Sequence, residues 1–337
     1  MTGRCESVLH RVRRVVALAA LSGLVAALTS CAGPGTSGPP PPEGDEIRVG
    51  VLQIAQATLL DATMVRFRER LTELAAPRRV TFDVQNANGD QSLIASIARD
   101  FARGDDDVFA VIGTPAVVAL AHQVTDRPVI AVAMGDPVGA GVAQTLDRPG
   151  GNVTGSTDFV EPAGLLPTIT SATPRPARIG TVFDPSNQNM TAWTRALHTA
   201  GRNAGLEIVD ATISGPGDVA SAARSLTGRA DAVLIGPDAT VVAGLDAVGA
   251  VAAQAHLPAY VIGGDATTTG ILASLGPDYP QVGAQAAEAA ARVLRGAPPG
   301  EVPFTRPQGV HLEINGAVQT ALGTTFPADV QSAATMR

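Results

Sequence analysis

A regular alternation of apolar and amphipathic segments constrains the fold of this chain more than any other feature. Short apolar runs with strand character are followed by stretches with helical spacing, and the pattern occupies most of the sequence. A glycine-rich segment, residues 129–158, divides it into two series. Strands that alternate with helices form parallel sheets with helices packed on their faces. The sequence therefore predicts an α/β protein with two lobes, each a parallel sheet flanked by helices.

Each series has its own set of expected elements. In the first series, periodicity and turn residues predict strands at 47–54, 80–84, 108–112 and 129–133, and helices at 61–75, at 91–102 and from residue 114 onward. In the second series they predict strands at 177–183, 206–213, 232–235, 259–262, 271–275 and 309–314, and helices at 162–171, 190–204, 218–226, 241–255, 280–294 and 317–322.

Composition excludes several classes of function. The chain has 337 residues with 45% hydrophobic content, which suffices for two folded bodies with sizeable cores. All 24 basic residues are arginine, so a P-loop lysine and a lysine Schiff base are both excluded. The net charge of −7 argues against a nucleic-acid partner, for which a basic face is expected.

The N-terminus has the pattern of a targeting segment. Several arginines precede an uncharged apolar run, residues 15–28, which is short for a membrane span and typical of a signal peptide. The run ends in Leu28-Thr-Ser-Cys31, which resembles the lipobox of bacterial lipoproteins. We therefore expect a signal peptide at 1–30, a lipid (palmitate) anchor on Cys31 and a proline- and glycine-rich tether at 31–46. The alternative is an ordinary signal peptide followed by a chance cysteine.

Small polar clusters follow five of the expected strands. If the two lobes face each other, the carboxyl ends of these strands meet at one cleft. Helix N-termini at such a cleft suit an anion and unpaired carboxylates suit a cation, so a zwitterion would satisfy both. The alternative for each cluster is an ordinary helix cap or turn. The clusters are Gly113-Thr114-Pro115, Gly135-Asp136-Pro137, Asp184-Pro185-Ser186-Asn187, Gly236-Pro237-Asp238 and Gly263-Gly264-Asp265.

Motifs of enzymes and of metal sites are missing from the sequence. It contains no G-x-S-x-G elbow, no H-E-x-x-H and no pair of cysteines in the mature chain. Its histidines lack a second ligand at metal spacing, and Gly139-Ala-Gly141 is only a fragment of a dinucleotide fingerprint. We therefore expect no catalytic residues, no metal and no cofactor.

Short motifs recur along the body of the chain in a characteristic order and spacing. They are Asn86-Ala-Asn-Gly-Asp90, Thr114-Pro-Ala, Asp136-Pro-Val-Gly-Ala-Gly141, Pro149-Gly-Gly-Asn-Val-Thr-Gly155, Asp184-Pro-Ser186, Asp238-Ala-Thr-Val-Val242 and Leu272-Ala-Ser-Leu-Gly276. In these motifs the chain resembles bacterial ABC-transporter substrate-binding lipoproteins with a type I periplasmic-binding fold, in the group that includes tryptophan- and tyrosine-binding members.

The resemblance implies two lobes that are joined by three crossovers and close on a ligand. Lobe 1 would comprise 47–156 plus 278–305, and lobe 2 would comprise 157–277 plus 306–337. The implied function is capture of a small solute, expected to be an amino acid, outside the cell membrane and its delivery to an ABC permease. One alternative is a ligand-sensing lipoprotein that acts with a membrane sensor. A hydrolytic enzyme on the same fold is disfavoured, because no nucleophile and base pair is evident.

The expected ligand-binding residues come from these strand ends and from the first lobe. Thr114 at a helix cap, with the amides of Ala116 and Val117, is the expected carboxylate site. Asp238 is the first choice for the ammonium and Asp136 the second. The family often has His-Pro after the first strand, where this chain has 57–61, and stacking aromatics are confined to Phe159, Phe183 and Trp193. The full set is Gln53, Thr58, Asp61, Asn86, Thr114, Pro115, Ala116, Gly135, Asp136, Phe159, Asp184, Ser186, Asn187, Asp238 and Asp265.

Overall fold

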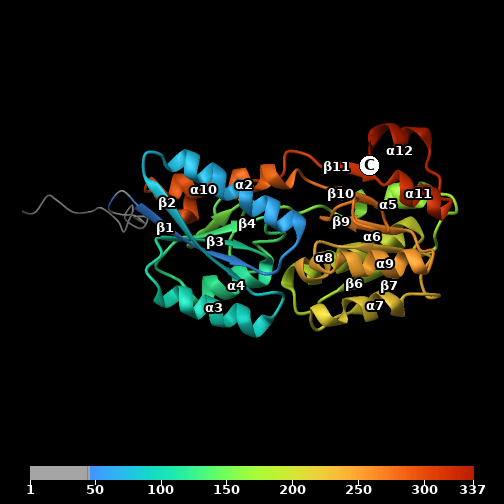
Figure 1. Ribbon diagram of the computed structural model, residues 1–337, viewed down its shortest axis with the longest axis horizontal. Coiled ribbons are helices and arrows are strands. Elements are labelled where there is room, and N and C mark those ends of the chain that lie inside the picture. Colours follow the sequence, from blue (N-terminus) through green and yellow to red (C-terminus); the bar gives the residue numbers. More distant parts are fainter. Residues whose placement is uncertain (1–43, 45) are drawn as a thin grey trace, which may run out of the picture. The chain divides into compact units, whose positions relative to one another are not determined.

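The computed structural model describes Gly44 and residues 46–337, which form two sheets with helices on their faces (Figure 1). The expected signal peptide, the lipidation site at Cys31 and all but the end of the tether lie outside the described residues. Glu46, the last expected tether residue, is the first residue of strand β1. Within the described part of the chain, no helix is both long and apolar enough to cross a membrane.

The first sheet has five parallel strands in the order β2-β1-β3-β4-β5. Strands β3 and β4 are entirely buried, as their unbroken apolar sequences require of a sheet covered on both faces. We call this sheet and its helices lobe 1. Its strands are β1 (Glu46–Gln53), β2 (Arg79–Asn86), β3 (Val108–Ile112), β4 (Val129–Val132) and β5 (Val153–Gly155).

Helices cover both faces of the first sheet. One face carries α2 (Thr58–Ala75) and, from much later in the chain, α10 (Tyr279–Leu294), and the other carries α3 (Gln91–Arg103) and α4 (Thr114–Gln123) (Figure 1). Gly283 permits the close approach of α10 to α2, because a Cβ there would lie 2.2 Å from the carbonyl oxygen of Thr63. Buried residues of α10 therefore belong to the core of lobe 1.

The second sheet has seven strands in the order β12-β11-β10-β9-β8-β6-β7, and only the β10–β11 pair is antiparallel. We call this sheet and its helices lobe 2. Its strands are β6 (Arg178–Phe183), β7 (Glu207–Thr212), β8 (Ala232–Ile235), β9 (Ala259–Ile262), β10 (Ile271–Gly276), β11 (His311–Ile314) and β12 (Thr335–Met336).

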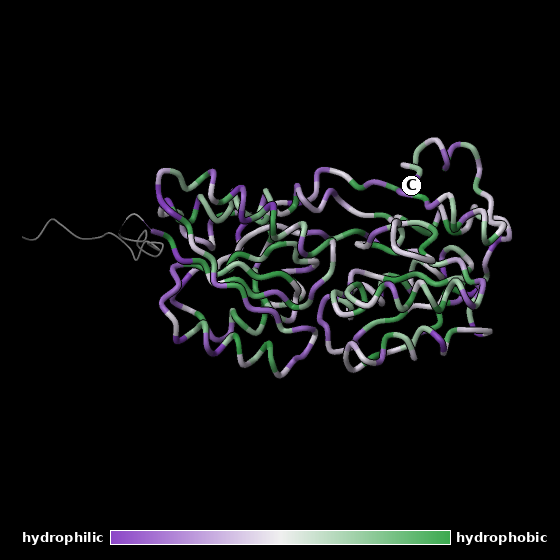
Figure 2. Tube along the Cα trace, in the orientation of Figure 1, coloured by the Kyte–Doolittle hydropathy of each residue, from purple (hydrophilic) through white to green (hydrophobic). Residues whose placement is uncertain are grey.

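The core of lobe 2 has two halves, one on each face of its sheet. Residues of α5 (Leu166–Ser171) and α6 (Gln188–Ala204) fill one half, and residues of α7 (Val219–Ser225) and α9 (Leu245–Gln254) fill the other. Figure 2 shows the hydrophobic segments gathered along the strands of both sheets, with hydrophilic segments toward the outside. The remaining short helices are η1 (Pro162–Gly164), η2 (Pro216–Asp218), η3 (Pro299–Glu301), α8 (Ala239–Ala243), α11 (Gly316–Leu322) and α12 (Ala328–Ala333).

Some boundaries differ from those expected from the sequence. Helix α2 begins at Thr58 rather than at 61, because the amide of Asp61 already donates to the carbonyl of Ala57 at 2.9 Å. The helix expected at 241–255 is two helices, α8 and α9, which meet at Gly244. Helix α12 and strand β12 were not expected from the sequence.

The chain passes three times between the two sheets: after β5, between β10 and α10, and after η3. The first and third passages run side by side. The amide of Thr157 donates to the carbonyl of Thr305 at 2.8 Å, and the amide of Thr305 donates to the carbonyl of Gly155 at 2.9 Å. This pairing ties both passages together next to the ends of the strands in lobe 1.

Candidate functional site

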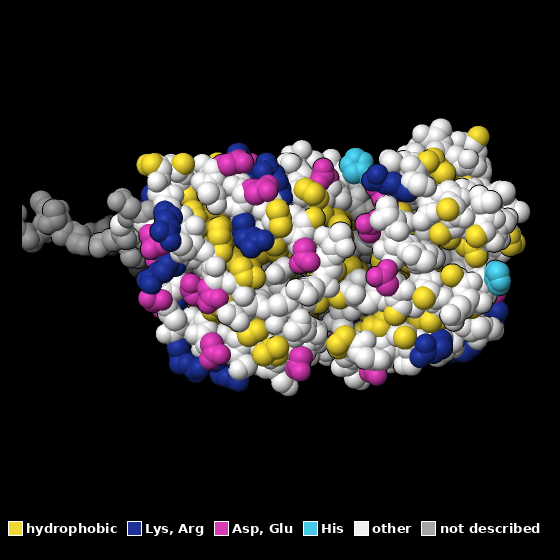
Figure 3. Space-filling view, viewed as in Figure 1, with side chains coloured by type: hydrophobic (Ala, Val, Ile, Leu, Met, Phe, Trp, Pro, Cys, Tyr) yellow, Lys and Arg dark blue, Asp and Glu magenta, His cyan; other side chains and the backbone are white. Residues whose placement is uncertain are grey.

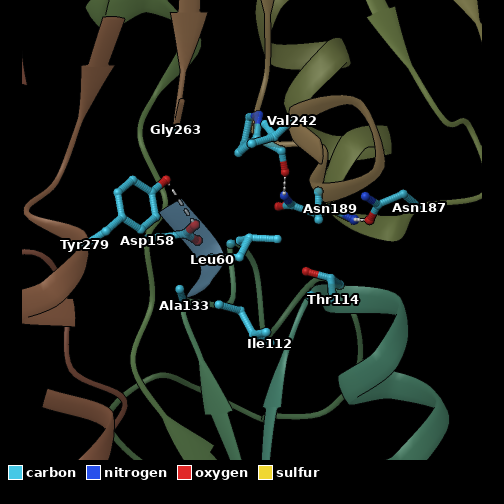
Figure 4. A pocket seen from close by; sticks show the side chains of 14 residues that line it. Leu60, Ile112, Thr114, Ala133, Asp158, Asn187, Asn189, Val242, Gly263 and Tyr279 are labelled. Carbon is cyan, nitrogen blue, oxygen red and sulfur yellow. Dashed lines mark hydrogen bonds between the residues drawn. The ribbon is translucent and has the colours of Figure 1, made fainter. Parts of the chain in front are cut away.

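A pocket lies where the carboxyl ends of strands from both lobes meet (Figure 4). Its cavity volume in this structure is about 30 Å³. This is far below the roughly 300–1,000 Å³ of typical ligand sites, so a ligand much larger than water requires the walls to move apart. Each of the five strand-end clusters contributes to its lining, as expected from parallel-sheet geometry. The contributing residues are Gly113, Thr114, Gly135, Asn187, Pro237 and Gly263.

Thr114 and the first turn of α4 form one polar part of the lining. The N-cap of α4 is Gly113, with φ of +104°, so Thr114 is the first helical residue rather than the cap expected from the sequence. The amide of Val117 donates to the carbonyl of Gly113 at 3.0 Å and is not available to an anion. Pro115 has no amide hydrogen. The donors left at this end are the Thr114 hydroxyl and the first-turn amides of Thr114 and Ala116, which have no partner within a helix.

Asp158 is a charged lining residue that the sequence reasoning missed. Its Oδ2 atom accepts a hydrogen bond from the hydroxyl of Tyr279 at 3.4 Å (Figure 4). Its Oδ1 atom is buried and has no hydrogen-bond partner among the described residues. Burial raises the pKa of this carboxyl to about 7, against smaller opposing effects of its own backbone amide and of the Tyr279 hydroxyl. The only sequence signal was its position directly after the first passage between the lobes.

Asn189, the second residue of α6, supplies a second acceptor on the opposite wall. Its Nδ2 atom donates to the carbonyl of Pro237 at 3.2 Å, and its Oδ1 atom is buried without a partner in the part of the chain that the structure describes. Gly135 of lobe 1 lies against this amide, since a Cβ on Gly135 would be 2.1 Å from Oδ1. Asn189 therefore joins the two lobes at the pocket.

The rest of the lining is largely apolar. Leu60, at the start of α2, lies between the Asp158 and Asn189 walls in the view of Figure 4. Ile112 and Ala133 line the pocket from the ends of strands in lobe 1, and Val242 lines it from α8 in lobe 2. The pocket thus combines a few polar groups with walls suited to an apolar side chain.

Asp238, the first choice for a ligand ammonium, occupies a different position from the one expected. It is fully buried, and its oxygens accept hydrogen bonds from the amides of Asp184 at 2.8 Å, Thr240 at 3.0 Å and Val241 at 3.4 Å. Burial raises its pKa to about 6. Asp238 caps α8 and links it to the end of β6 beneath the pocket, while its neighbours Pro237 and Ala239 line the pocket.

The cluster after β6 is a folded turn with one residue at the pocket. The Oδ1 atom of Asp184 accepts hydrogen bonds from the amide and the hydroxyl of Ser186, at 2.8 and 2.7 Å. Asn187 is the N-cap of α6 and accepts from the amide of Asn189 at 3.2 Å. Of these residues, Asn187 lines the pocket.

Two other expected site residues lie at a second hollow. Asp136 and Phe159 line it together with Arg306 and the exposed Val138 and Val310. The Oδ1 atom of Asp136 accepts from the amide of Gly139 at 2.8 Å. The second choice for the ammonium therefore also lies outside the lining of the interlobe pocket.

The remaining expected residues make local contacts in the structure. Gln53 donates to Asp61 at 3.1 Å, Asn86 accepts from the amide of Asn88 at 2.7 Å, and Asp265 accepts from the amide of Thr267 at 2.7 Å. The exposed Thr58 begins α2, and the buried Phe183 and Trp193 belong to the core of lobe 2.

The charged groups of the described residues show neither a metal site nor a basic patch. Among the residues that the structure describes, no group of three His, Cys, Asp or Glu side chains could hold a metal ion. On the face shown in Figure 3, arginines are interspersed with acidic side chains rather than gathered in a basic patch.

Comparisons with known proteins agree with this architecture. A family model described as ABC transporter substrate binding protein matches residues 48–337. A tyrosine-binding protein of Clostridioides difficile (strain R20291) is 30% identical over 276 residues, which cover 81% of this chain and 80% of the relative.

Solved structures with 27–31% identity share the fold, and each comparison covers 86% of this chain and 99% of the other. A conserved domain protein of Vibrio cholerae has 31% identity and a TM-score of 0.81. A Streptococcus pneumoniae ABC domain in complex with L-Trp has 28% identity and a TM-score of 0.81. A substrate-binding protein of Clostridium difficile in its ligand-free, open form has 27% identity and a TM-score of 0.61.

The fold class expected from the sequence is thereby confirmed as the two-lobed periplasmic-binding type. The matched family is one of substrate-binding proteins rather than of enzymes, as the sequence also indicated. This chain belongs to the ABC transporter substrate-binding protein family.

Proposed function

We propose that this protein binds an amino acid with an aromatic side chain between its lobes, outside the cell membrane, and delivers it to an ABC permease. The proposal rests chiefly on Asp158, whose Oδ1 atom is a buried acceptor without a partner among the described residues and lines the interlobe pocket. A buried carboxylate oxygen that lacks a partner is unfavourable, and a ligand ammonium would supply that partner.

The other polar end of the ligand is a carboxylate. Thr114 offers a hydroxyl and lies in the first turn of α4, where the helix dipole favours an anion. With the cation site on Asp158 and the anion site on Thr114, a zwitterion spans the pocket. Leu60, Ile112 and Val242 then contact the ligand's side chain.

Two relatives support an aromatic side chain on the ligand. One relative is described as tyrosine-binding and another was solved with L-Trp. Two relatives with nearly the same sequence identity to this chain differ in how closely their structures match it. The TM-score is 0.81 for the L-Trp complex and 0.61 for the ligand-free, open protein. This difference supports a hinge motion that closes the lobes around the ligand.

Calorimetry with L-tryptophan and L-tyrosine tests the proposal. We expect Asp158→Asn to weaken binding about ten- to a hundredfold, because a hydrogen bond between charged groups is lost. Asp136→Asn is the matched control and should bind the ligand as the wild type does. Asp136 lies outside the pocket lining and accepts a hydrogen bond from the backbone amide of Gly139. Equal affinities of wild type and Asp158→Asn would contradict the proposed site.

Transport is distinguished from sensing in cells. Cells that lack this protein should lose high-affinity uptake of the radiolabelled amino acid, and the wild-type gene should restore it while the Asp158→Asn gene should not. Unchanged uptake together with a lost transcriptional response to the amino acid would favour the sensing lipoprotein instead. The lipid anchor on Cys31 would keep the receptor close to either membrane partner.

A further inference from the structure

We infer that Asn189 selects ligands whose side chain carries a hydrogen-bond donor, such as an indole N–H or a phenol O–H, over side chains of the same shape without one. The inference rests on the proposed binding of aromatic amino acids and assigns a specificity role within the same pocket. It is carried by the Oδ1 atom of Asn189, a second buried acceptor that has no partner within residues 46–337.

The orientation of the Asn189 amide is fixed by its partner. Its Nδ2 atom lies 3.2 Å from the carbonyl oxygen of Pro237, and a carbonyl only accepts hydrogen bonds. The amide nitrogen must therefore face Pro237, which leaves the oxygen as the free atom. Asn189 lines the pocket and is 3% exposed, so bulk water does not compensate this oxygen.

The surroundings of Asn189 hold it rigidly. Its main-chain amide donates to Asn187, the N-cap of α6, and Pro237 precedes Asp238, which is anchored by three backbone amides. Gly135 packs against the side-chain amide from lobe 1. A preorganised acceptor of this kind discriminates strongly, because a ligand without the donor leaves a buried polar atom unpaired.

Asn189 is also placed apart from the proposed ammonium site. Asp158 follows the first passage between the lobes, whereas Asn189 is on α6, and Leu60 lies between them in Figure 4. An ammonium held by Asp158 thus leaves the Asn189 oxygen for a donor elsewhere on the ligand.

Two matched ligand pairs test this assignment by calorimetry. The pairs are L-tryptophan with L-3-benzothienylalanine, in which sulfur replaces the indole N–H, and L-tyrosine with L-phenylalanine. For at least one pair we expect the wild type to prefer the donor-bearing member by about five- to a hundredfold. In Asn189→Ala the preference should fall below about twofold. Val242→Ala is the control for a changed pocket wall and should lower the affinity for both members of a pair by the same factor.

The outcomes separate this inference from the proposed function. Equal affinities within both pairs in the wild type, or a preference that persists in Asn189→Ala, would overturn the role of Asn189 while amino-acid binding stands. If Asn189→Ala lost the same factor of affinity for both members of a pair, the inference would also be overturned, because Asn189 would then act on the ammonium or on lobe closure. No binding of any of the four ligands would overturn the proposed function as well. If Asn189→Ala does not fold, Asn189→Leu provides the same comparison, because leucine keeps the size of the side chain without an acceptor.

Discussion

Gly135 of lobe 1 lies directly against the side chain of Asn189 in lobe 2, where a Cβ on Gly135 would be 2.1 Å from Oδ1 and 2.6 Å from Cγ. No side chain fits between these two groups while the lobes keep this arrangement. Asn189 cannot easily move aside, because its Nδ2 atom is bonded to Pro237. Contact between the lobes at the pocket therefore requires a glycine at this position, whatever the loop itself requires.

Gly135→Ala tests this requirement. The added methyl group should hold the lobes apart and weaken ligand binding at least tenfold, with little effect on the melting temperature of the ligand-free protein, whose lobes can remain open. Small-angle scattering should show compaction on ligand addition for the wild type and less compaction for the variant. Gly141→Ala, in the same loop with nothing within 4 Å of its Cβ position, controls for a general effect of alanine, although its positive φ adds some strain. Normal affinity in Gly135→Ala would contradict the steric argument.

The convergence of the five clusters could be predicted because it follows from local patterns. Apolar runs such as 108–112 mark strands, helices between them impose a parallel sheet, and parallel strands end at the same edge. Gly113, Gly135 and Gly263 then arrive at one pocket from widely separated positions in the chain.

The roles of individual polar groups at the pocket could not be predicted, because they depend on distant hydrogen bonds. Asp238 looked available for a ligand, but the amide of Asp184, 54 residues away, takes one of its oxygens. Asp158 was not among the expected site residues, yet its Oδ1 atom is left without a partner in the described chain. Which carboxyl stays free is decided by tertiary packing rather than by the local sequence.

Asp238→Asn should act on stability rather than on the ligand. The substitution replaces one acceptor oxygen with an amino group that faces a backbone amide, and a lost buried hydrogen bond costs about 1–3 kcal/mol. We expect a lower free energy of unfolding in urea with ligand affinity within about threefold of the wild type. Asp136→Asn should leave the free energy of unfolding nearly unchanged. A large loss of affinity at unchanged stability would instead restore Asp238 as the ammonium site.

Cys31→Ala tests the expected lipid anchor. Acylation requires the cysteine sulfur, and Cys31 is the only cysteine left after removal of residues 1–30. Labelled palmitate should therefore be incorporated into the wild type and into Cys5→Ala but not into Cys31→Ala. Because one acyl chain binds membranes only marginally, stable membrane association would require more than one chain. Unchanged labelling of Cys31→Ala would show that the motif near Leu28 is not a lipobox.

The protonation of Asp158 should couple ligand affinity to pH. Burial raises the pKa of this carboxyl to about 7 in the ligand-free protein, against an ordinary value near 3.8. An ammonium ligand requires the ionised form, so binding below pH 7 must release a proton. Affinity should therefore fall by up to about tenfold per pH unit below pH 7 and become constant above it. Calorimetry at pH 6 in buffers of different ionisation enthalpy measures the released proton directly, and Asp158→Asn should release none.

The same carboxyl should affect the stability of the ligand-free protein in the opposite direction to binding. Because its folded pKa lies above its unfolded pKa, its stabilising contribution is complete below pH 4 and is lost as the pH rises through about 7. Asp238, with a pKa raised to about 6, shifts stability in the same sense. The comparison that isolates Asp158 is therefore the melting temperature of Asp158→Asn minus that of the wild type, which should increase between pH 5 and pH 8. A difference independent of pH, together with no proton release on binding, would show that this carboxyl is already ionised in the empty pocket.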